Sequence, residues 1–301
     1  MILLISGAFK YSEAQKKAIE GMGYSIVDMP QEKDPLPVDA SSIDAVICNG
    51  LFLHHKIADF TNLQFIQLTS AGLDRVPLDY INSHNIKLYN ARGVYSIPMA
   101  EWTMLRILER YKFLGHFNDC QKTREWNKLR TLRELSGEKV AIIGAGNVGS
   151  EIARRLSAFG TKITGYDLRE SNIPYFDEVR LISRFKEDVP DFDIIILTAP
   201  LTDQTRNMID AMALESMKDN AMIVNVSRGG LIDEDALAYT LREHPQMNAA
   251  LDVFNVEPLP KESALWDLDN VKLSPHNSFV SNKNQNRLFD VIYNNLLNHA
   301  Q

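Results

Sequence analysis

The sequence predicts an α/β protein with two domains, each built around a parallel sheet. The chain has 301 residues, the usual length of two domains. Short apolar segments alternate with polar, helix-compatible segments along most of it, and strands that alternate with helices form parallel sheets. Its 45% hydrophobic and 24% charged residues are typical of a globular chain with an ample core.

The first third of the chain contains five apolar runs that we interpret as strands. Between the first two, the stretch from Ser12 to Met22 has a serine N-cap and apolar residues at helical spacing, which predicts a helix. The proline-rich, charged segment "QEKDPLPVD" predicts a surface loop. The five runs read "MILLIS", "YSIVDM", "AVICN", "FIQLTS" and "IKLYN".

A longer helix is predicted through "MAEWTMLRILERYKFL", with Ser96 as N-cap and Pro98 near the first turn. Polar residues dominate from Asn118 to Glu138, which indicates a linking arm. A second strand–helix series begins at "KVAII", and its later strands read "DIIILT", "MIVNV", "AALDVF" and "VKLS".

The last segment, "NQNRLFDVIYNNLLNHA", predicts an amphipathic helix that packs back on the first domain. We place the domain boundary near Ile97. The expected domains are therefore residues 1–97 with 281–301, a discontinuous domain, and residues 98–280.

The bulk properties argue against several functional classes. A formal net charge of −7 argues against nucleic acid or an anionic membrane as the main partner. No apolar run has the length of a membrane span, and "MILLIS" is too short for a secretory signal. Cys48 and Cys120 show neither metal-ligand spacing nor a disulfide framework, so we expect no metal site and a cytoplasmic location.

A glycine-rich turn in "VAIIGAGNVGSEIA" predicts a dinucleotide site of the Rossmann type. Gly144 permits the tight turn, Gly146 lets a pyrophosphate approach the backbone, and Gly149 lets the helix pack closely on the strand. Asp167 ends the next strand, 167 − 149 = 18 residues on, where a carboxylate can bind the ribose hydroxyls of NAD. Arg169 leaves NADP open, and a glycine turn without a ligand is the alternative.

Three further residues follow strands of the second half and therefore leave the same edge of the sheet. Arg228 can grip a carboxylate in a bidentate fork, and His276 can exchange a proton near neutral pH. Glu257 can orient the histidine and stabilise its imidazolium form. Each residue alone is more often structural than catalytic, but together they suit hydride transfer to a 2-keto acid.

The segments "NVSRGGLIDEDAL", "ALDVFNVEPLP" and "LSPHNS" resemble the signatures of the D-isomer-specific 2-hydroxyacid dehydrogenase family, and the glycine segment resembles its NAD site. The resemblance covers nearly the whole chain. It implies a flavodoxin-like substrate domain, a Rossmann domain that binds NAD, and D-stereospecificity. It also implies Arg228 as carboxylate anchor, His276 as general acid/base and Glu257 as its partner.

The resemblance implies further site residues. For the substrate these are the backbone of Ala71 and Gly72 in "TSAGLDRVPLD", and Tyr95, although Gly72 could mark an ordinary turn and Tyr95 could simply pack. The role of Arg92 is open. The arm from Met99 to Ser136 resembles the family's dimerisation region, which implies a homodimer. The implied cofactor residues are Gly144, Gly146, Asn147, Val148, Gly149, Asp167, Thr198, Pro200, Thr205, Val226, Ser227 and Asp252.

Alternative functions remain open at this point. Some relatives are corepressors that act as NAD-gated scaffolds, although this chain shows no added tail or basic arm for a protein partner. Phosphite or phosphoglycerate dehydrogenases share much of the constellation, whereas Glu257 argues against a formate dehydrogenase. The substrate itself, such as pyruvate, glyoxylate, hydroxypyruvate or a branched analogue, is not resolved by sequence.

Overall fold

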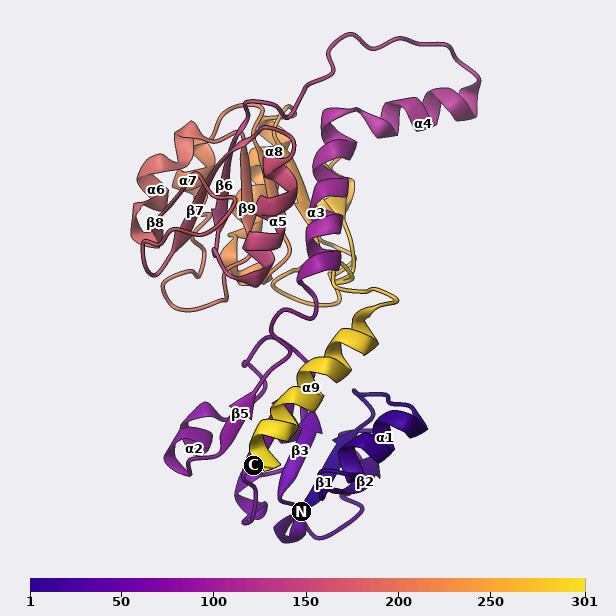
Figure 1. Ribbon diagram of the computed structural model, residues 1–301. Coiled ribbons are helices and arrows are strands. Elements are labelled where there is room, and N and C mark those ends of the chain that lie inside the picture. Colours follow the sequence, from indigo (N-terminus) through magenta and orange to yellow (C-terminus); the bar gives the residue numbers. More distant parts are fainter. Residues whose placement is uncertain (301) are drawn as a thin grey trace. The chain divides into compact units, whose positions relative to one another are not determined.

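The computed structural model describes residues 1–300, which divide into two compact units (Figure 1). Unit 1 contains Met1–Tyr95 and the chain from Ser281 onward, and unit 2 contains Ser96–Val280. The two crossings between the units thus lie at residues 95/96 and 280/281.

Unit 1 is built on a five-stranded parallel sheet in the order β2-β1-β3-β4-β5, the flavodoxin-like order. The serine N-cap predicted for its first helix is present, because Ser12 and Gln15 form a reciprocal capping box. The elements of unit 1 are β1 (Ile2–Ser6), α1 (Glu13–Glu20), β2 (Ser25–Met29), β3 (Ala45–Cys48), β4 (Phe65–Leu68), α2 (Leu78–Ser83), β5 (Lys87–Tyr89) and α9 (Asn284–Ala300).

The last helix, α9, packs on unit 1 as its amphipathic pattern predicts. Leu288, Ile292 and Leu296 lie on one stripe of the helix and are buried against the face of the sheet that α1 also covers. The opposite face packs on α2 and on the loops around it. Figure 1 shows α9 running alongside the strands of unit 1, so distant segments of the chain share one core.

Unit 2 is built on a seven-stranded sheet in the order β12-β11-β10-β9-β6-β7-β8, with every neighbouring pair parallel. This is the Rossmann order extended by one strand. Its elements are α3 (Ser96–Tyr111), α4 (Leu114–Thr123), β6 (Lys139–Ile143), α5 (Asn147–Ser157), β7 (Lys162–Asp167), β8 (Glu178–Leu181), α6 (Phe185–Asp188), β9 (Ile194–Leu197), α7 (Ala211–Ser216), β10 (Met222–Asn225), α8 (Glu234–Glu243), β11 (Asn248–Leu251) and β12 (Val271–Leu273).

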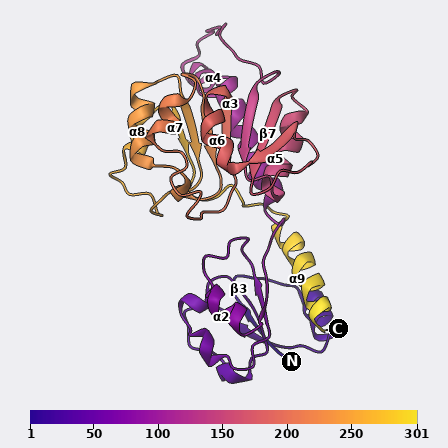
Figure 2. The ribbon, with the colours of Figure 1, turned by 90° about the vertical axis from the view of Figure 1, so that its left-hand side faces the viewer.

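Helices cover both faces of this sheet. Alternate residues of β6 point to opposite sides, so Val140 and Ile142 pack under α3 and α5, while Ala141 and Ile143 join the core under α6, α7 and α8. Figure 2 looks onto α6, α7 and α8. Strands buried on both sides read as continuous apolar runs, which is why "KVAII" and "DIIILT" were recognisable in the sequence. The predicted α/β fold class is confirmed.

Three local features differ from the sequence prediction. The expected linking arm begins with a helix, α4, which buries only Cys120 and therefore lacks a clear apolar stripe. Figure 1 shows α4 and the loop after it projecting from the sheet of unit 2. The edge strand β8 was not predicted, because only Val179 of its four residues is buried. Helix α3 begins at Ser96 itself, which was predicted as the N-cap.

Within residues 1–300, no helix combines the length and apolar character needed to cross a membrane. The same residues contain no cluster of three or more His, Cys, Asp or Glu side chains suited to holding a metal ion.

Candidate active site

The carboxyl ends of the parallel strands of unit 2 bring most of the predicted site residues to one edge. The glycine turn follows β6, Thr198 follows β9, and Asp252 follows β11. Arg228 lies three residues beyond β10, and His276 three residues beyond β12. Ligands of open α/β sheets bind outside this edge, which makes it the candidate active site of unit 2.

The glycine turn has the geometry of a dinucleotide site. Gly144 adopts φ +101°, and a Cβ there would lie 2.8 Å from the amide nitrogen of Ala199. A Cβ on Gly149 would lie 2.1 Å from the carbonyl oxygen of Gly144, whereas one on Gly146 would have no neighbour within 4 Å. Gly146 therefore leaves open space at the N-terminus of α5, which no side chain caps. These residues fit a pyrophosphate bound by backbone N–H groups.

Asp167 is held beside the glycine turn at the end of β7. One carboxylate oxygen accepts the N–H of Ala145 at 2.9 Å, and the other accepts the N–H of Leu168 at 2.7 Å. Each carboxylate oxygen has two lone pairs, so Asp167 retains capacity to accept ribose hydroxyls. Arg169 is exposed two residues further on.

The other predicted cofactor residues mostly bind the loops of this edge to one another. The Thr198 hydroxyl donates to the Gly144 carbonyl at 2.7 Å, and the Ser227 hydroxyl donates to the Ala199 carbonyl. The Thr205 hydroxyl donates to the carbonyl of Pro200 at 2.7 Å. The side chain of Val226 packs in the core between the sheet and α3, so only its backbone could meet a cofactor. Asn147 and Val148 are the first residues of α5.

His276 and Glu257 form the side-chain pair expected of a proton-exchanging site. The Nδ1 atom of His276 lies 2.8 Å from Oε2 of Glu257, and the two side chains are 40% and 36% exposed. The second carboxylate oxygen of Glu257 accepts the N–H of Phe254 at 3.0 Å. With Nδ1 held by the carboxylate, Nε2 is the ring atom that can exchange a proton with a substrate.

Arg228 lies on a turn that packs tightly against the loop carrying Glu257. A Cβ on Gly229 would lie 2.0 Å from the carbonyl carbon of Phe254, so only glycine fits there. The guanidinium of Arg228 donates to the carbonyl of Ser227 at 2.8 Å. The backbone carbonyl of Arg228 accepts a hydrogen bond from the side-chain amide of Asn225. The arginine turn and the glutamate loop therefore position each other.

Asp252 supports the His276 loop through contacts that the sequence did not reveal. Its carboxylate is completely buried and accepts N–H bonds from Asn277 at 2.8 Å and Ser278 at 2.9 Å, together with the Ser274 hydroxyl. Its backbone carbonyl accepts the N–H of His276, which adopts φ +51°. The described contacts of Asp252 are those of a positioning residue, and its place among the cofactor residues, as the family resemblance implies, stays a prediction.

Glu234, at the start of α8, is a second supporting carboxylate that was missed. One of its oxygens accepts the N–H of Asn255 at 2.5 Å, two residues before Glu257. Partial burial raises the pKa of Glu234, and the negative charges of Asp235 and Glu257 add to this effect. Its place in the first turn of a helix is sufficiently explained by the helix dipole, so the sequence offered no sign of this second role.

The predicted substrate residues of unit 1 lie around the end of β4. The Ala71 carbonyl accepts from the Asn90 amide at 2.7 Å, and the Gly72 carbonyl accepts from the Ser70 hydroxyl at 3.2 Å. The phenol of Tyr95 donates to the backbone carbonyl of Thr69, and burial raises its pKa. Tyr95 therefore holds the start of this loop in place.

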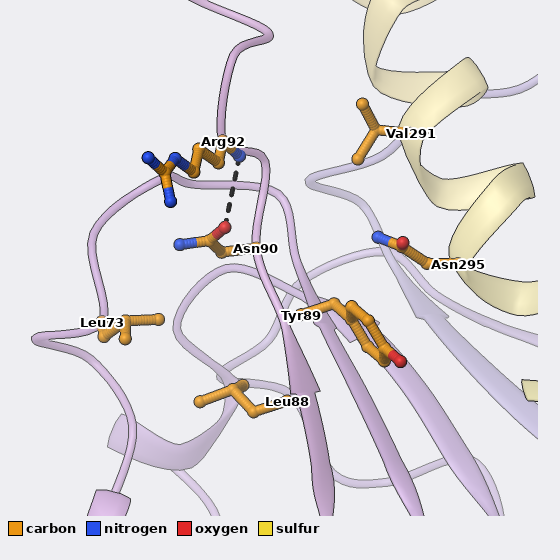
Figure 3. A pocket seen from close by; sticks show the side chains of 7 residues that line it. All are labelled: Leu73, Leu88, Tyr89, Asn90, Arg92, Val291 and Asn295. Carbon is orange, nitrogen blue, oxygen red and sulfur yellow. Dashed lines mark hydrogen bonds between the residues drawn. The ribbon is translucent and has the colours of Figure 1, made fainter. Parts of the chain in front are cut away.

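Arg92, whose role was open, lines a cavity of about 350 Å³ within unit 1 (Figure 3). Its backbone N–H donates to the side-chain oxygen of Asn90 at 3.3 Å, drawn as the dashed line. The cavity wraps the end of the edge strand β5. Its remaining lining residues are Leu73, Leu88, Tyr89, Val291 and Asn295.

The chain matches known proteins of one family. Residues 104–278 match the family model described as D-isomer specific 2-hydroxyacid dehydrogenase, NAD binding domain. The chain is 37% identical over 220 residues to a hydroxypyruvate reductase of Thermotoga maritima, covering 71% of this chain and 70% of that protein. It is 30% identical over 285 residues to a glyoxylate reductase of Thermofilum pendens, and this match covers 90% of this chain and 82% of that protein.

A third relative, D-3-phosphoglycerate dehydrogenase of Methanocaldococcus jannaschii, is 37% identical over 222 residues. That match covers 71% of this chain but only 41% of the relative, so the chain spans less than half of its length.

Solved structures with the same fold cover almost the entire chain. A D-isomer specific 2-hydroxyacid dehydrogenase family protein from Aeromonas salmonicida has a TM-score of 0.82 at 25% identity and covers 98% of this chain and 93% of its own. A D-isomer specific 2-hydroxyacid dehydrogenase from Lactobacillus delbrueckii, complexed with NAD, has a TM-score of 0.75 at 20% identity. That match covers 100% of this chain and 97% of the other. One from Xanthobacter autotrophicus, complexed with NADPH, has a TM-score of 0.80 at 22% identity, covering 99% and 94%.

Proposed function

Because this chain belongs to the D-isomer specific 2-hydroxyacid dehydrogenase family, we propose that it catalyses hydride transfer between NAD and a small 2-keto or 2-hydroxy acid. The family and its named relatives are oxidoreductases that act on CH–OH groups. The observation that carries the proposal is the His276–Glu257 pair, 2.8 Å apart, on the same sheet edge as the glycine turn.

In this proposal His276 is the general acid/base. During reduction its Nε2–H gives a proton to the oxygen of the substrate carbonyl, and during oxidation the neutral ring takes the proton back. Glu257 holds Nδ1, so the ring keeps one orientation and its positive charge is stabilised. Closure of the site around the substrate would exclude water and strengthen these interactions.

Arg228 is the proposed anchor of the substrate carboxylate, because a guanidinium binds a planar carboxylate through two parallel hydrogen bonds. Within unit 1, the backbone around Ala71 and Gly72 is the proposed second carboxylate contact, and Tyr95 supports that loop through its bond to Thr69. Unit 1 is accordingly proposed as the substrate domain and unit 2 as the dinucleotide-binding domain.

The cofactor is proposed to be NAD, with the glycine turn at its pyrophosphate and Asp167 at its ribose hydroxyls. A 2′-phosphate would be repelled by this carboxylate, which is fixed by two backbone N–H groups. The further residues that would surround the cofactor are Asn147, Val148, Thr198, Pro200, Thr205, Ser227 and the backbone of Val226. The partners we propose are a small 2-keto or 2-hydroxy acid and a second copy of the chain.

The test is oxidation of NADH or NADPH by the purified protein in the presence of a panel of 2-keto acids, followed by absorbance. We expect NADH to be preferred, and we expect His276→Ala to lower kcat by about 10²–10⁴-fold while NADH binding, followed by fluorescence, is retained. Full turnover by the His276→Ala protein would contradict the assigned role. A preference for NADPH would indicate that Arg169, and not Asp167, determines the choice of cofactor.

A further inference from the structure

An apolar cavity of about 530 Å³ adjoins the His276–Glu257 pair within unit 2. Both members of the pair line it, and His276 also meets the ring of Phe279 edge-on at 5.9 Å. The rest of its wall is contributed mainly by Phe254, Pro258, Leu259, Trp266, Leu273 and Pro275. The volume is in the range of small-molecule sites, which are mostly apolar with a few polar groups.

The wall of this cavity is held in place by contacts of its own. The indole N–H of Trp266 donates to the carbonyl of Pro260 at 2.9 Å, and Leu265 beside it is buried in the core. Leu259 and Leu273 pack against the same core of unit 2. The shape of the cavity is therefore fixed by the packing of the loops that carry His276 and Glu257.

The charges around the cavity exclude a strongly anionic occupant. None of the described residues that line it is a lysine or an arginine, and the positive charge that His276 can carry lies against Glu257. A phosphate or sulfonate group placed here would lose its hydration and meet Glu257 without a compensating cation. An aliphatic or aromatic group would instead be transferred from water to apolar surface, which is favourable by about 25 cal/mol per Å².

The geometry points to the substrate class: the cavity beside His276 receives the side chain of the keto acid, and that side chain is apolar and larger than methyl. The inference rests on the proposed function, because it assumes that the substrate carbonyl lies at Nε2 of His276. The first atom of a side chain on that carbonyl carbon lies two bonds from the carbonyl oxygen, which would accept a hydrogen bond from His276, one of the residues that line the cavity. The preferred substrates are then 2-oxo acids with branched aliphatic or aromatic side chains.

The first experiment is a substrate series with NADH: glyoxylate, pyruvate, 2-oxobutanoate and 4-methyl-2-oxopentanoate. Hydroxypyruvate serves as the polar match of 2-oxobutanoate, and 3-phosphohydroxypyruvate as the anionic probe. Because one methylene in a hydrophobic pocket changes kcat/KM by about 10–200-fold, we expect at least a ~10-fold rise from pyruvate to 4-methyl-2-oxopentanoate. We also expect 2-oxobutanoate to exceed hydroxypyruvate.

A variant adds a test that is specific to the cavity. Leu259→Trp should fill it and lower the ratio of kcat/KM for 4-methyl-2-oxopentanoate over pyruvate by about 10-fold. Leu181→Trp is the matched control, since Leu181 ends β8, away from the cavity lining, and is 39% exposed. If Leu259→Trp fails to fold, the wild-type series still decides the question.

The outcomes separate this inference from the proposed function. A flat or falling series, or a preference for hydroxypyruvate or 3-phosphohydroxypyruvate, overturns the inference and leaves the dehydrogenase proposal standing. If the protein binds NADH but turns over none of the acids, the proposed function fails and the inference fails with it.

Discussion

The carboxylate of Asp252 is completely buried, yet three donors from the loop after β12 satisfy it. Asp252→Asn would turn an acceptor into an amide whose NH₂ group faces backbone N–H donors. A buried donor left without its partner costs about 1–3 kcal/mol. We expect the free energy of unfolding to fall by about that amount, measured by urea unfolding.

The activity of Asp252→Asn should fall as well, because the same loop carries His276. Asp235→Asn is the control, since Asp235 is an exposed residue in the first turn of α8. An Asp252→Asn protein as stable and as active as the control would show that the buried network does not position His276.

Glu234 accepts a hydrogen bond from the loop that carries Glu257, so its substitution should affect catalysis. Glu234→Ala removes the acceptor of the Asn255 N–H and loosens the loop that carries Glu257. Because a hydrogen bond is worth about 0.5–1.5 kcal/mol, kcat should fall by about 2–10-fold, with little change in the KM for NADH.

Glu234→Gln retains an oxygen acceptor and should restore most of that kcat. If Glu234→Ala and Glu234→Gln were equally impaired, the negative charge of Glu234 rather than its hydrogen bond would be the important property. A fall in NADH affinity alone would instead contradict the positioning role.

Two glycines of the turn between β6 and α5 differ in the space around them. A Cβ on Gly149 would meet the Gly144 carbonyl at 2.1 Å, whereas one on Gly146 has open space. Gly149→Ala should therefore lower the melting temperature, because overpacking costs about 1–3 kcal/mol. Gly146→Val should leave the melting temperature nearly unchanged and weaken NADH binding at least ~10-fold by blocking the backbone from the pyrophosphate.

Thermal unfolding and NADH titration of both variants separate these effects. A Gly146→Val protein that binds NADH like the wild type would place the pyrophosphate elsewhere.

The last turn of α9 carries a histidine that makes stability depend on pH. The ring of His299 stacks on Phe65 with centroids 4.9 Å apart, and both ring nitrogens are buried without a hydrogen-bond partner among the described residues. Burial lowers the pKa of His299, and the nearby charge of Lys87 lowers it further.

A histidine whose pKa is lower in the folded than in the unfolded state stabilises the fold only while it is neutral. Its contribution is complete above the ordinary value of about 6.5 and is lost as the pH falls through that value toward the lower folded pKa. The free energy of unfolding should fall between pH 7.5 and pH 5, and His299→Leu should flatten this dependence. His54→Leu, at an exposed position, should leave it unchanged.

The whole molecule presents an exposed apolar surface on its projecting segment. Leu114, Trp126 and Leu132 are exposed on α4 and the loop after it, with Trp126 91% exposed, and Leu105 is exposed on the preceding helix α3. Large apolar side chains that are exposed on consecutive segments of a chain indicate an interface. We expect the protein to sediment at twice its chain mass of 34.1 kDa.

Trp126→Arg together with Leu105→Arg should shift the sedimentation toward the monomer, because each buries a charge in the expected interface. Tyr239→Arg, at an exposed aromatic on α8, is the control. A wild-type protein that sediments as a monomer at micromolar concentration would contradict the expected homodimer.

The elements that sequence predicted best are those whose signals are local. Apolar runs such as that of β9 mark strands buried on both faces, and the stripe of Leu288, Ile292 and Leu296 marks α9. The strand β8 and the helix α4 were not recognised, and each of them buries only one residue. Their formation depends on pairing at a sheet edge or on the helix that precedes them.

The positions of Arg228, Glu257 and His276 after parallel strands were sufficient to place all three on one edge, since every such strand points the same way. Sequence spacing alone cannot report which side chains then meet. The roles of Asp252 and Glu234 arise from loops that lie 22 and 21 residues away along the chain from Ser274 and Asn255. The cavity beside His276 likewise exists only because several loops pack around it, and packing depends on shape in three dimensions, which periodicity does not record.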